Sequence, residues 1–430
     1  MKLPKFIKNN IVLKITSLNA VVITIRLIVS VFIQRLLAVT VGEAGIASIG
    51  QLRNVLVMLT STSTLGTFNG IVKYVAEQKK DKPELAKLFS TVSVFIFVGG
   101  LVSAIILFFG SQFFSDYLFN SEDYSYLFKL LAVIIPFIGI NRAVSGVVNG
   151  LSDYKKYAKI ELISYLLATI AILIGLYTSK LDGVLIAIAL APVIQVLVLV
   201  FVFGKTLKSH VNLKQLNFVL TYKNKLLAFT LMSFVSSFLL SYVEINIRTT
   251  VTNSISVEDA GYWTAVTFIS KNYMVFATGL FTLYVIPKFA NINNQTDFKN
   301  EVINIYKTIL PIFGIGMLLV YIFRNLIIDI IYPNFLGMEP LFKWQLVGDF
   351  IRLCALVLSH QFLAKRLVKS FVITEIISLI LFYVLTKLFI PLYGTEGVVM
   401  AHLVRYIIYF IIVIFVVREY YRKTPLQPNR

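Results

Sequence analysis

Nine ionisable side chains lie inside long apolar runs of this 430-residue sequence. The cations are Arg26, Arg53, Arg142, Lys271, Arg352 and Arg405, and the acids are Glu244, Asp349 and Glu375. At bilayer depth each such group costs at least about 2.5 to 3.5 kcal/mol, so it is tolerated mainly where it faces water, a partner or a substrate. The cationic excess suits an anionic ligand, and the planar fork of arginine suits phosphate oxygens. We therefore take the six cations as candidate substrate-binding residues and the three acids as candidates for ion coupling or ion pairing.

Pairing along one helix offers a purely structural role for two of the acids. Glu244 and Arg248 stand four residues apart, and Asp349 and Arg352 stand three apart, so each pair can close a bridge on its own helix. The other five cations, Arg26, Arg53, Arg142, Lys271 and Arg405, have no acid within four residues. Each can still pair across helices or extend to the membrane interface. The sequence leaves both roles open.

The apolar runs predict membrane-spanning helices. Apolar residues make up 58% of the chain and charged residues only 14%, against about 25% in a soluble domain. This composition excludes a water-soluble globule. We count twelve stretches, several of them longer than the roughly 20 residues that a bilayer needs. They cover residues 10–39, 44–76, 84–114, 124–150, 156–178, 182–204, 222–252, 257–290, 299–331, 338–364, 367–391 and 394–421.

Lysine and arginine gather in alternate gaps between these stretches. Basic clusters lie at 73–87, 155–159, 205–225 and 365–369, whereas the opposite gaps are sparse and acidic. Because basic loops stay on the cytoplasmic side, we expect both termini to face the cytoplasm. The net charge of +19 then belongs mostly to loops that fix topology and meet anionic lipid, and it requires no nucleic-acid partner.

Three short motifs recur at a nearly constant distance along the chain. VGEAG from Val41 returns as VEDAG from Val257, LFK at Leu127 returns at Leu341, and DGVLIA at Asp182 returns as EGVVMA at Glu396. The three offsets agree to within two positions, which indicates two copies of a six-helix unit. An even number of helices places both copies the same way up, related by an axis along the membrane normal.

The expected fold is therefore an all-α polytopic membrane protein. Twelve helices form two parallel six-helix repeats around a central cavity. The predicted parts are an N-terminal lobe, a cytoplasmic linker, a C-terminal lobe and a cytoplasmic tail, at residues 1–204, 205–221, 222–421 and 422–430.

Other chemistries have little support in the sequence. The one cysteine, Cys354, lies in a span, and the three histidines, His210, His360 and His402, have no metal-ligand spacing, so we expect no metal and no cofactor. There is no phosphate-binding Gly-x-x-x-x-Gly-Lys motif, which excludes ATP hydrolysis by the chain itself. The outer gaps, of about 5 to 15 residues, are too short for the catalytic loop of a membrane glycosyltransferase. These features favour a transporter over an enzyme.

Three blocks resemble a known family. Phe68-Asn-Gly-Ile-Val-Lys-Tyr-Val-Ala-Glu77, Phe342-Lys-Trp-Gln-Leu-Val-Gly-Asp349 and Val41-Gly-Glu-Ala-Gly45 are similar to segments of the bacterial O-antigen and enterobacterial common antigen flippases. These flippases belong to the multidrug/oligosaccharidyl-lipid/polysaccharide exporter superfamily. The resemblance implies two six-helix lobes around a central cavity, and Arg53 and Asp349 match an arginine and an aspartate of the similar flippases. The chain departs from the common-antigen flippases at Ser270-Lys271, where they carry Ser-Asp.

The resemblance implies a function in O-antigen and lipopolysaccharide biosynthesis. An undecaprenyl-diphosphate-linked oligosaccharide would move from the cytoplasmic to the periplasmic leaflet of the bacterial inner membrane by alternating access. The implied partners are that glycan, membrane lipids and glycan polymerase machinery. Two alternatives remain: a cation-coupled drug exporter, which would place acids in its cavity, and a membrane glycan polymerase or ligase, which would need a long outer loop.

Overall fold

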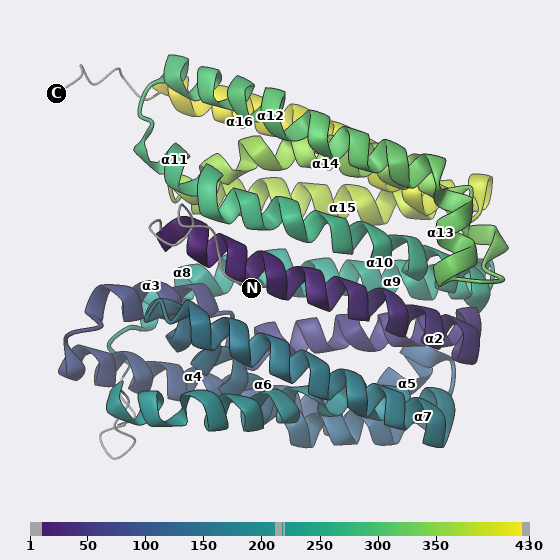
Figure 1. Cartoon of the computed structure of the whole chain (residues 1–430), viewed down its shortest axis with the longest axis horizontal. Helices are drawn as coiled ribbons and strands as arrows, with labels where there is room; N and C mark the ends of the chain where they lie inside the picture. The colour runs from purple at the N-terminus through teal and green to yellow at the C-terminus, as the bar shows by residue number, and fades with distance from the viewer. Residues whose placement is uncertain (1–10, 211–216, 218–219, 424–430) are drawn as a thin grey trace. The chain divides into compact units, whose positions relative to one another are not determined.

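The structure is a computed structural model that describes residues 11–210, 217 and 220–423. All of the elements in these ranges are helices (Figure 1). Parts of the predicted linker, 205–221, and of the predicted tail, 422–430, lie outside the described residues, as do the first ten residues.

The first half of the chain forms two very long helices with four shorter ones between them. These are α2 (Ile11–Thr62), α3 (Phe68–Gln78), α4 (Lys82–Phe109), α5 (Ser111–Phe119), α6 (Ser125–Gly150) and α7 (Tyr154–His210), with a 3₁₀ turn, η1 (Glu122–Tyr124). The backbone leaves helical geometry at Gly42 inside α2 and at Ser179 and Lys180 inside α7. Each long helix is therefore two spans joined by a tight bend.

The second half forms six spans with more interruptions. The first is α8 (Lys223–Ser233), the π-helical segment η3 (Phe234–Leu239) and α9 (Leu240–Ser254); the second is α10 (Val257–Leu280), the π-helical η4 (Phe281–Val285) and α11 (Ile286–Asn291). The rest are α12 (Gln295–Ile322), α13 (Arg324–Ile331), the 3₁₀ turn η5 (Leu336–Met338), α14 (Leu341–Ala364), α15 (Val368–Tyr393) and α16 (Glu396–Lys423).

The number of spans agrees with the sequence prediction. Nine segments of the described chain are long and apolar enough to cross a membrane. Two of them, Val21–Thr62 and Lys155–Leu207, contain the bends just described and hold two spans each. With the 24-residue α10 they make twelve, which confirms a multi-pass, all-α membrane protein.

The backbone repeats the pattern that the motifs predicted. The series α4, α5, η1, α6 of the first half returns as α12, α13, η5, α14 in the second. Lys180 (φ 46°, ψ −123°) and Gly394 (φ 57°, ψ −140°), which are separated by the same offset as the motifs, hold nearly the same rare conformation. The motif glycines Gly183 and Gly397 also correspond, and each lies so close to the backbone of the preceding helix that a Cβ atom would meet a carbonyl oxygen, at 2.1 and 2.5 Å. These matches confirm two six-helix repeats.

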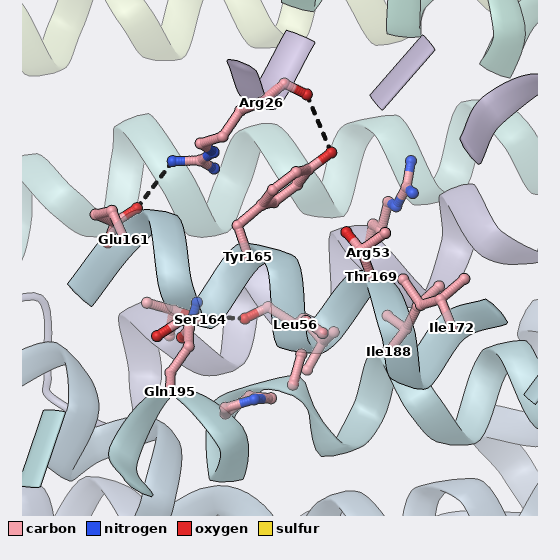
Figure 2. A pocket seen from close by; sticks show the side chains of 14 residues that line it. Arg26, Arg53, Leu56, Glu161, Ser164, Tyr165, Thr169, Ile172, Ile188 and Gln195 are labelled. Atoms are coloured by element: carbon pink, nitrogen blue, oxygen red, sulfur yellow. Dashed lines mark hydrogen bonds and ion pairs between the residues drawn. The ribbon is translucent and has the colours of Figure 1, made fainter. Parts of the chain in front are cut away.

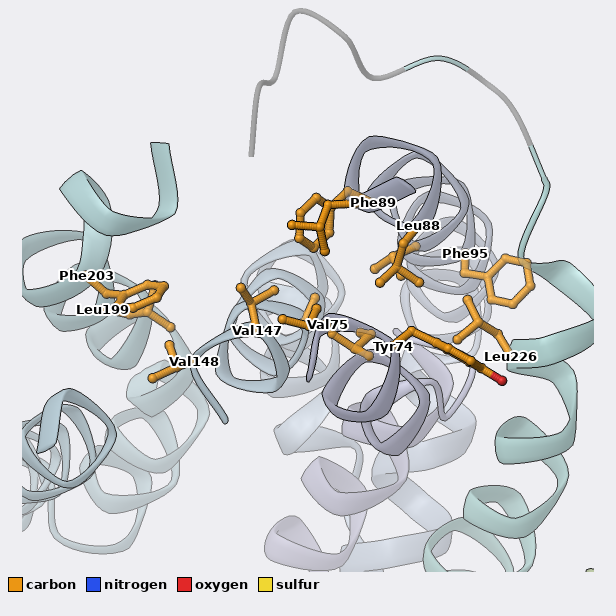
Figure 3. Close-up of a cluster of buried hydrophobic side chains, with 14 of the residues drawn as sticks. Tyr74, Val75, Leu88, Phe89, Phe95, Val147, Val148, Leu199, Phe203 and Leu226 are labelled. Carbon is orange, nitrogen blue, oxygen red and sulfur yellow. The ribbon is translucent and has the colours of Figure 1, made fainter. Parts of the chain in front are cut away.

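The chain divides into two compact units that cut across the bend in α2. One unit holds Met1–Val41 with Gln51–Ser241, and the other holds Gly42–Gly50 with Tyr242–Arg430. In the first unit, fully buried apolar side chains from α3, α4, α6 and α7 form one core together with Leu226 of α8 (Figure 3). Among them are Ile71, Val75, Leu88, Val148 and Phe203. This core fixes α3 and α6, which carry part of the candidate site.

Candidate functional site

The first unit contains a cavity of about 300 Å³ between the two limbs of α2 and the two limbs of α7. Arg26 of the first limb and Arg53 of the second line it, and the side chains shown in Figure 2 surround it. Half of the other twelve lining residues are apolar, and the polar half consists of Thr60, Glu161, Ser164, Tyr165, Thr169 and Gln195. The structure thus brings together two of the six predicted cations.

Arg26 has an acidic partner that the sequence did not reveal. Its Nη1 atom lies 2.9 Å from Oε2 of Glu161, which lines the same cavity from α7 (Figure 2). Tyr165 donates its hydroxyl to the backbone oxygen of Arg26 at 3.1 Å, and its ring lies 5.0 Å from the guanidinium carbon. The Arg26 and Glu161 side chains keep 41% and 29% of their surfaces exposed, so the pair meets water. With Arg53, the cavity holds two positive charges and one negative.

A second cavity of about 230 Å³ contains Arg142 of α6. Five hydroxyl side chains share its wall: Thr60, Ser61, Thr64, Ser233 and Ser237. The Arg142 guanidinium carbon lies 3.6 Å from the centre of the Phe68 ring of α3. Thr60 also lines the first cavity, so the two cavities adjoin along the second limb of α2.

The second unit contains a buried polar network around Asp349 of α14. The fully buried carboxylate accepts hydrogen bonds from Ser270, from Tyr273 and from Gln345. Nε2 of His402 lies 3.0 Å from its other oxygen, and Nη1 of Arg352 lies 4.0 Å from that oxygen. The predicted contact between Asp349 and Arg352 is present, and the four other partners come from α10, α14 and α16.

The remaining candidates of the second unit have separate partners. Lys271 pairs with Glu244 at 2.8 Å, and Glu375 accepts a hydrogen bond from Tyr409 at 2.6 Å. Arg405 is buried, donates to Ser378 at 2.8 Å, and lies over the ring of Phe382. Among the described residues, no carboxylate lies within 4.0 Å of this guanidinium. This guanidinium is therefore held by ring stacking and by hydrogen bonds to the neutral hydroxyl groups of Ser378 and Tyr406.

The described residues contain no cluster of possible metal ligands. Within those residues, no group of three or more His, Cys, Asp or Glu side chains could hold a metal ion. The polar chemistry of the fold lies instead in the two cavities of the first unit and in the Asp349 network.

Twelve spans in two six-helix repeats, with arginines lining cavities between the spans, define a membrane transporter. The family described as polysaccharide biosynthesis protein matches residues 46–335, and the chain belongs to it. This confirms the family resemblance of the short motifs.

Relatives and solved structures agree with this family. The chain is 26% identical over 377 residues to the lipid III flippase of Escherichia coli (strain K12), covering 87% of this chain and 91% of that protein, and it matches the lipid III flippase of Shigella flexneri equally well. An inward-facing MATE family transporter of the MOP superfamily shares the fold with a TM-score of 0.74 at 13% identity, over 93% of this chain and 96% of that one. The lipid II flippase MurJ, in an inward closed conformation, gives 0.70 at 17% identity, over 93% and 87%.

Proposed function

We propose that this protein is a flippase for an undecaprenyl-diphosphate-linked oligosaccharide and that the cavity of Arg26 and Arg53 receives the diphosphate. The observation that carries the proposal is the pair of arginines from the two limbs of α2 in one cavity between membrane spans. The similarity to lipid III flippases supports the same class of cargo. Arginine presents two parallel N–H donors to phosphate oxygens, so two such side chains match a diphosphate.

The physical task explains why such a cavity is useful. A charged, sugar-bearing head must cross about 30 Å of hydrocarbon, where an unpaired charge is strongly disfavoured. Guanidinium groups and cavity water replace its lost hydration while the prenyl tail stays in lipid. Binding alone does not move cargo in one direction, so the cavity must open to one leaflet at a time.

The other candidate residues take secondary roles in this proposal. Arg142 contacts a more distant part of the head, and Lys271, Arg352 and Arg405 are candidate substrate contacts within the second unit. The Asp349 network is the candidate for energy coupling, because a change in charge on this one carboxylate would alter its bonds to three helices at once. Glu244 and Glu375 serve as ion-pair and hydrogen-bond partners.

The proposed setting is the bacterial inner membrane, with both termini in the cytoplasm. The basic clusters at 73–87 and 155–159 would then face the side on which the lipid-linked glycan is assembled. Polymerase machinery on the opposite side would consume the flipped product. A cation-coupled drug exporter is disfavoured by the two arginines of the cavity and by the similarity to lipid III flippases.

Substitution of Arg53 tests the proposal. In cells that depend on this protein for a surface glycan, Arg53→Ala should stop glycan export and cause the lipid-linked precursor to accumulate, while the protein remains at normal abundance in the membrane. Arg53→Lys should restore export only in part, because lysine lacks the fork. Normal export by the Ala variant would refute the assignment of Arg53 to the diphosphate.

Purified protein in liposomes separates a flippase from a drug exporter. Added prenyl-diphosphate glycan should become accessible on the far leaflet only when the protein is present, and a cationic dye should not compete with it. Competition by the dye without glycan movement would support the exporter.

A further inference from the structure

The cavity around Arg142 differs in chemistry from the neighbouring cavity of Arg26 and Arg53. Arg142 is the one charged side chain among its nine lining residues, and five of the others carry hydroxyl groups. None of the hydrogen bonds or ion pairs among the described residues involves Arg142; the Glu161 carboxylate acts on it only from beyond 4.0 Å and is itself paired with Arg26. An arginine in a membrane span without an ion-pair partner is costly unless an anion meets it.

The Arg142 guanidinium stacks on the Phe68 ring, and this contact fixes its orientation toward a planar anion. Its carbon atom lies 3.6 Å from the centre of the Phe68 ring, which covers one face of the group. The N–H donors lie in the plane of the guanidinium, so a stacked group still directs them outward along its edges. Gly146, one turn after Arg142, lets α3 approach α6, since a Cβ atom there would lie 3.0 Å from Ile71. The contact between Phe68 and Arg142 is thus held by helix packing.

Part of the backbone that lines this cavity, at Thr64 and Gly66, is not helical. Between α2 and α3 the chain turns through Leu65 and Gly66, both with positive φ. The turn lies at the level of the middle of α4, because a Cβ atom on Gly99 would lie 2.3 Å from the carbonyl oxygen of Thr62. A Cβ atom on Gly66 would lie 2.6 Å from Ser233. Irregular backbone in the middle of a membrane bundle is tolerated where it is buried in protein or lines a polar cavity, and broken helices mark binding sites in transporters.

The hydroxyl groups suit a sugar. Thr60 donates to the backbone oxygen of Leu56 at 2.8 Å, and Thr64 donates to that of Thr60 at 3.2 Å. Their oxygens therefore remain available as acceptors for hydroxyl groups of a ligand. Ser61 and Ser233 lie 3.4 Å apart and can donate or accept. A wall that can both donate and accept, with a single cation, matches a sugar ring that bears one negative charge.

We propose that the Arg142 cavity binds an acidic sugar of the glycan, with the guanidinium holding its carboxylate. This inference rests on the proposed flippase function. A single guanidinium matches one carboxylate, whereas the neighbouring cavity offers two arginines, Arg26 and Arg53, to the diphosphate. Arg53 and Thr60 are separated by seven residues, about 10 Å along α2. Asn141, the neighbour of Arg142 on α6, donates to Gln195 of the first cavity at 2.6 Å. The acidic sugar is therefore one of those closest to the diphosphate.

The test compares two prenyl-diphosphate disaccharides that differ only in the second sugar, glucuronic acid or glucose. The purified full-length protein, in lipid nanodiscs, should bind the glucuronic acid probe about tenfold or more tightly than the glucose probe, because a charge-assisted hydrogen bond contributes at least that factor. Arg142→Gln should remove this preference and leave the glucose probe within twofold of its original affinity. Arg142→Lys should keep part of the preference.

Lys129→Gln is the matched control. It removes one positive charge from the same helix, α6, at an exposed position that lines neither cavity, and it should change neither affinity. Equal affinity of the wild-type protein for the two probes would overturn the inference, even if Arg142→Gln failed to fold. Equal weakening of both probes by Arg142→Gln would also overturn it, since Arg142 would then contact the diphosphate or serve the fold. Failure of the wild-type protein to bind either probe would refute the proposed function as well.

Discussion

Replacing Glu161 by Gln tests how the first cavity balances binding against release. In the structure, Glu161 pairs with Arg26 at 2.9 Å. A diphosphate that enters the cavity must compete with this carboxylate for the same guanidinium. Glu161→Gln keeps the size of the side chain and removes the negative charge. We therefore expect the variant to bind a prenyl-diphosphate glycan more tightly than the wild-type protein does.

The size of the gain follows from the geometry of the pair. Unit charges 2.9 Å apart attract by about 1.4 kcal/mol in water and by about 6 kcal/mol at an effective dielectric constant near 20. Because both side chains are partly exposed, at 41% and 29%, the lower figure is the better guide, and measured exposed pairs reach about 1 kcal/mol or less. A difference of about 1 kcal/mol corresponds to roughly a fivefold change in Kd. Salt should reduce the gain by screening the charges.

Equilibrium binding to purified protein in nanodiscs, at low and high salt, measures this effect. Glu77→Gln provides the control, since it removes the same charge from an exposed Lys73–Glu77 pair on α3 that lines neither cavity, and its Kd should not change. The reasoning fails if Glu161→Gln binds the glycan more weakly, because Glu161 would then contact the cargo itself. It also fails if Glu77→Gln strengthens binding equally, since net charge alone would be responsible.

Three further predictions concern the scaffold and the second unit, and thermal unfolding of the purified protein measures each. Gly183→Ala should destabilise the protein by about 1 to 3 kcal/mol, because its Cβ atom would lie 2.1 Å from the oxygen of Gly175. The control Gly204→Ala should not destabilise it, because that Cβ atom would meet only Val200, at 3.8 Å. An equal loss of stability in both variants would contradict the packing argument. Lys180→Gly should stabilise the protein by about 1 kcal/mol and Gly394→Ala should destabilise it by a similar amount, because both positions need positive φ. If neither variant differs in stability from the wild-type protein, these turns relax without strain. Asp349→Asn should destabilise the protein by about 3 kcal/mol or more, since His402 and Arg352 lose their shared buried acid. Ser270→Ala should cost less, because it removes only one hydrogen bond to Asp349. Unchanged stability of the Asp349→Asn variant would mean that the network has no structural role.

The sequence predicts the spans and the repeat because both depend on patterns along the chain. Apolar length identified most spans independently of packing, and the constant offset was visible in motifs whose glycines, such as Gly183 and Gly397, are fixed by close backbone contact. The bend at Lys180 falls in the predicted gap between residues 156–178 and 182–204, but its positive φ was not predictable, since lysine is rare in such a conformation. The break at Leu65 and Gly66 lacks a proline that would have marked it.

The sequence identified the arginines that line the two cavities, but it did not identify the side chains that surround them. The positions of Arg26, Arg53 and Arg142 deep in apolar runs identified them as candidates, because a charged side chain in a membrane span is rare. Glu161 follows a basic cluster, and its meeting with Arg26 depends on a contact between residues 135 positions apart. The hydroxyl groups around Arg142 are neutral and common in membrane helices, so they do not stand out. Only the fold shows that five of them share one cavity with a guanidinium.

The repeat also shows how the two halves have diverged. The offset that relates the motifs pairs Glu161 with Glu375 and Ile188 with His402. In the first half the acid meets Arg26 and the isoleucine lines an open cavity; in the second the acid accepts a bond from Tyr409 and the histidine contacts Asp349. Equivalent positions thus form a hollow in one copy and a closed network of polar side chains in the other. One six-helix backbone thus supports two kinds of polar interior, and a substitution at one position need not have the same effect at its counterpart 214 residues away.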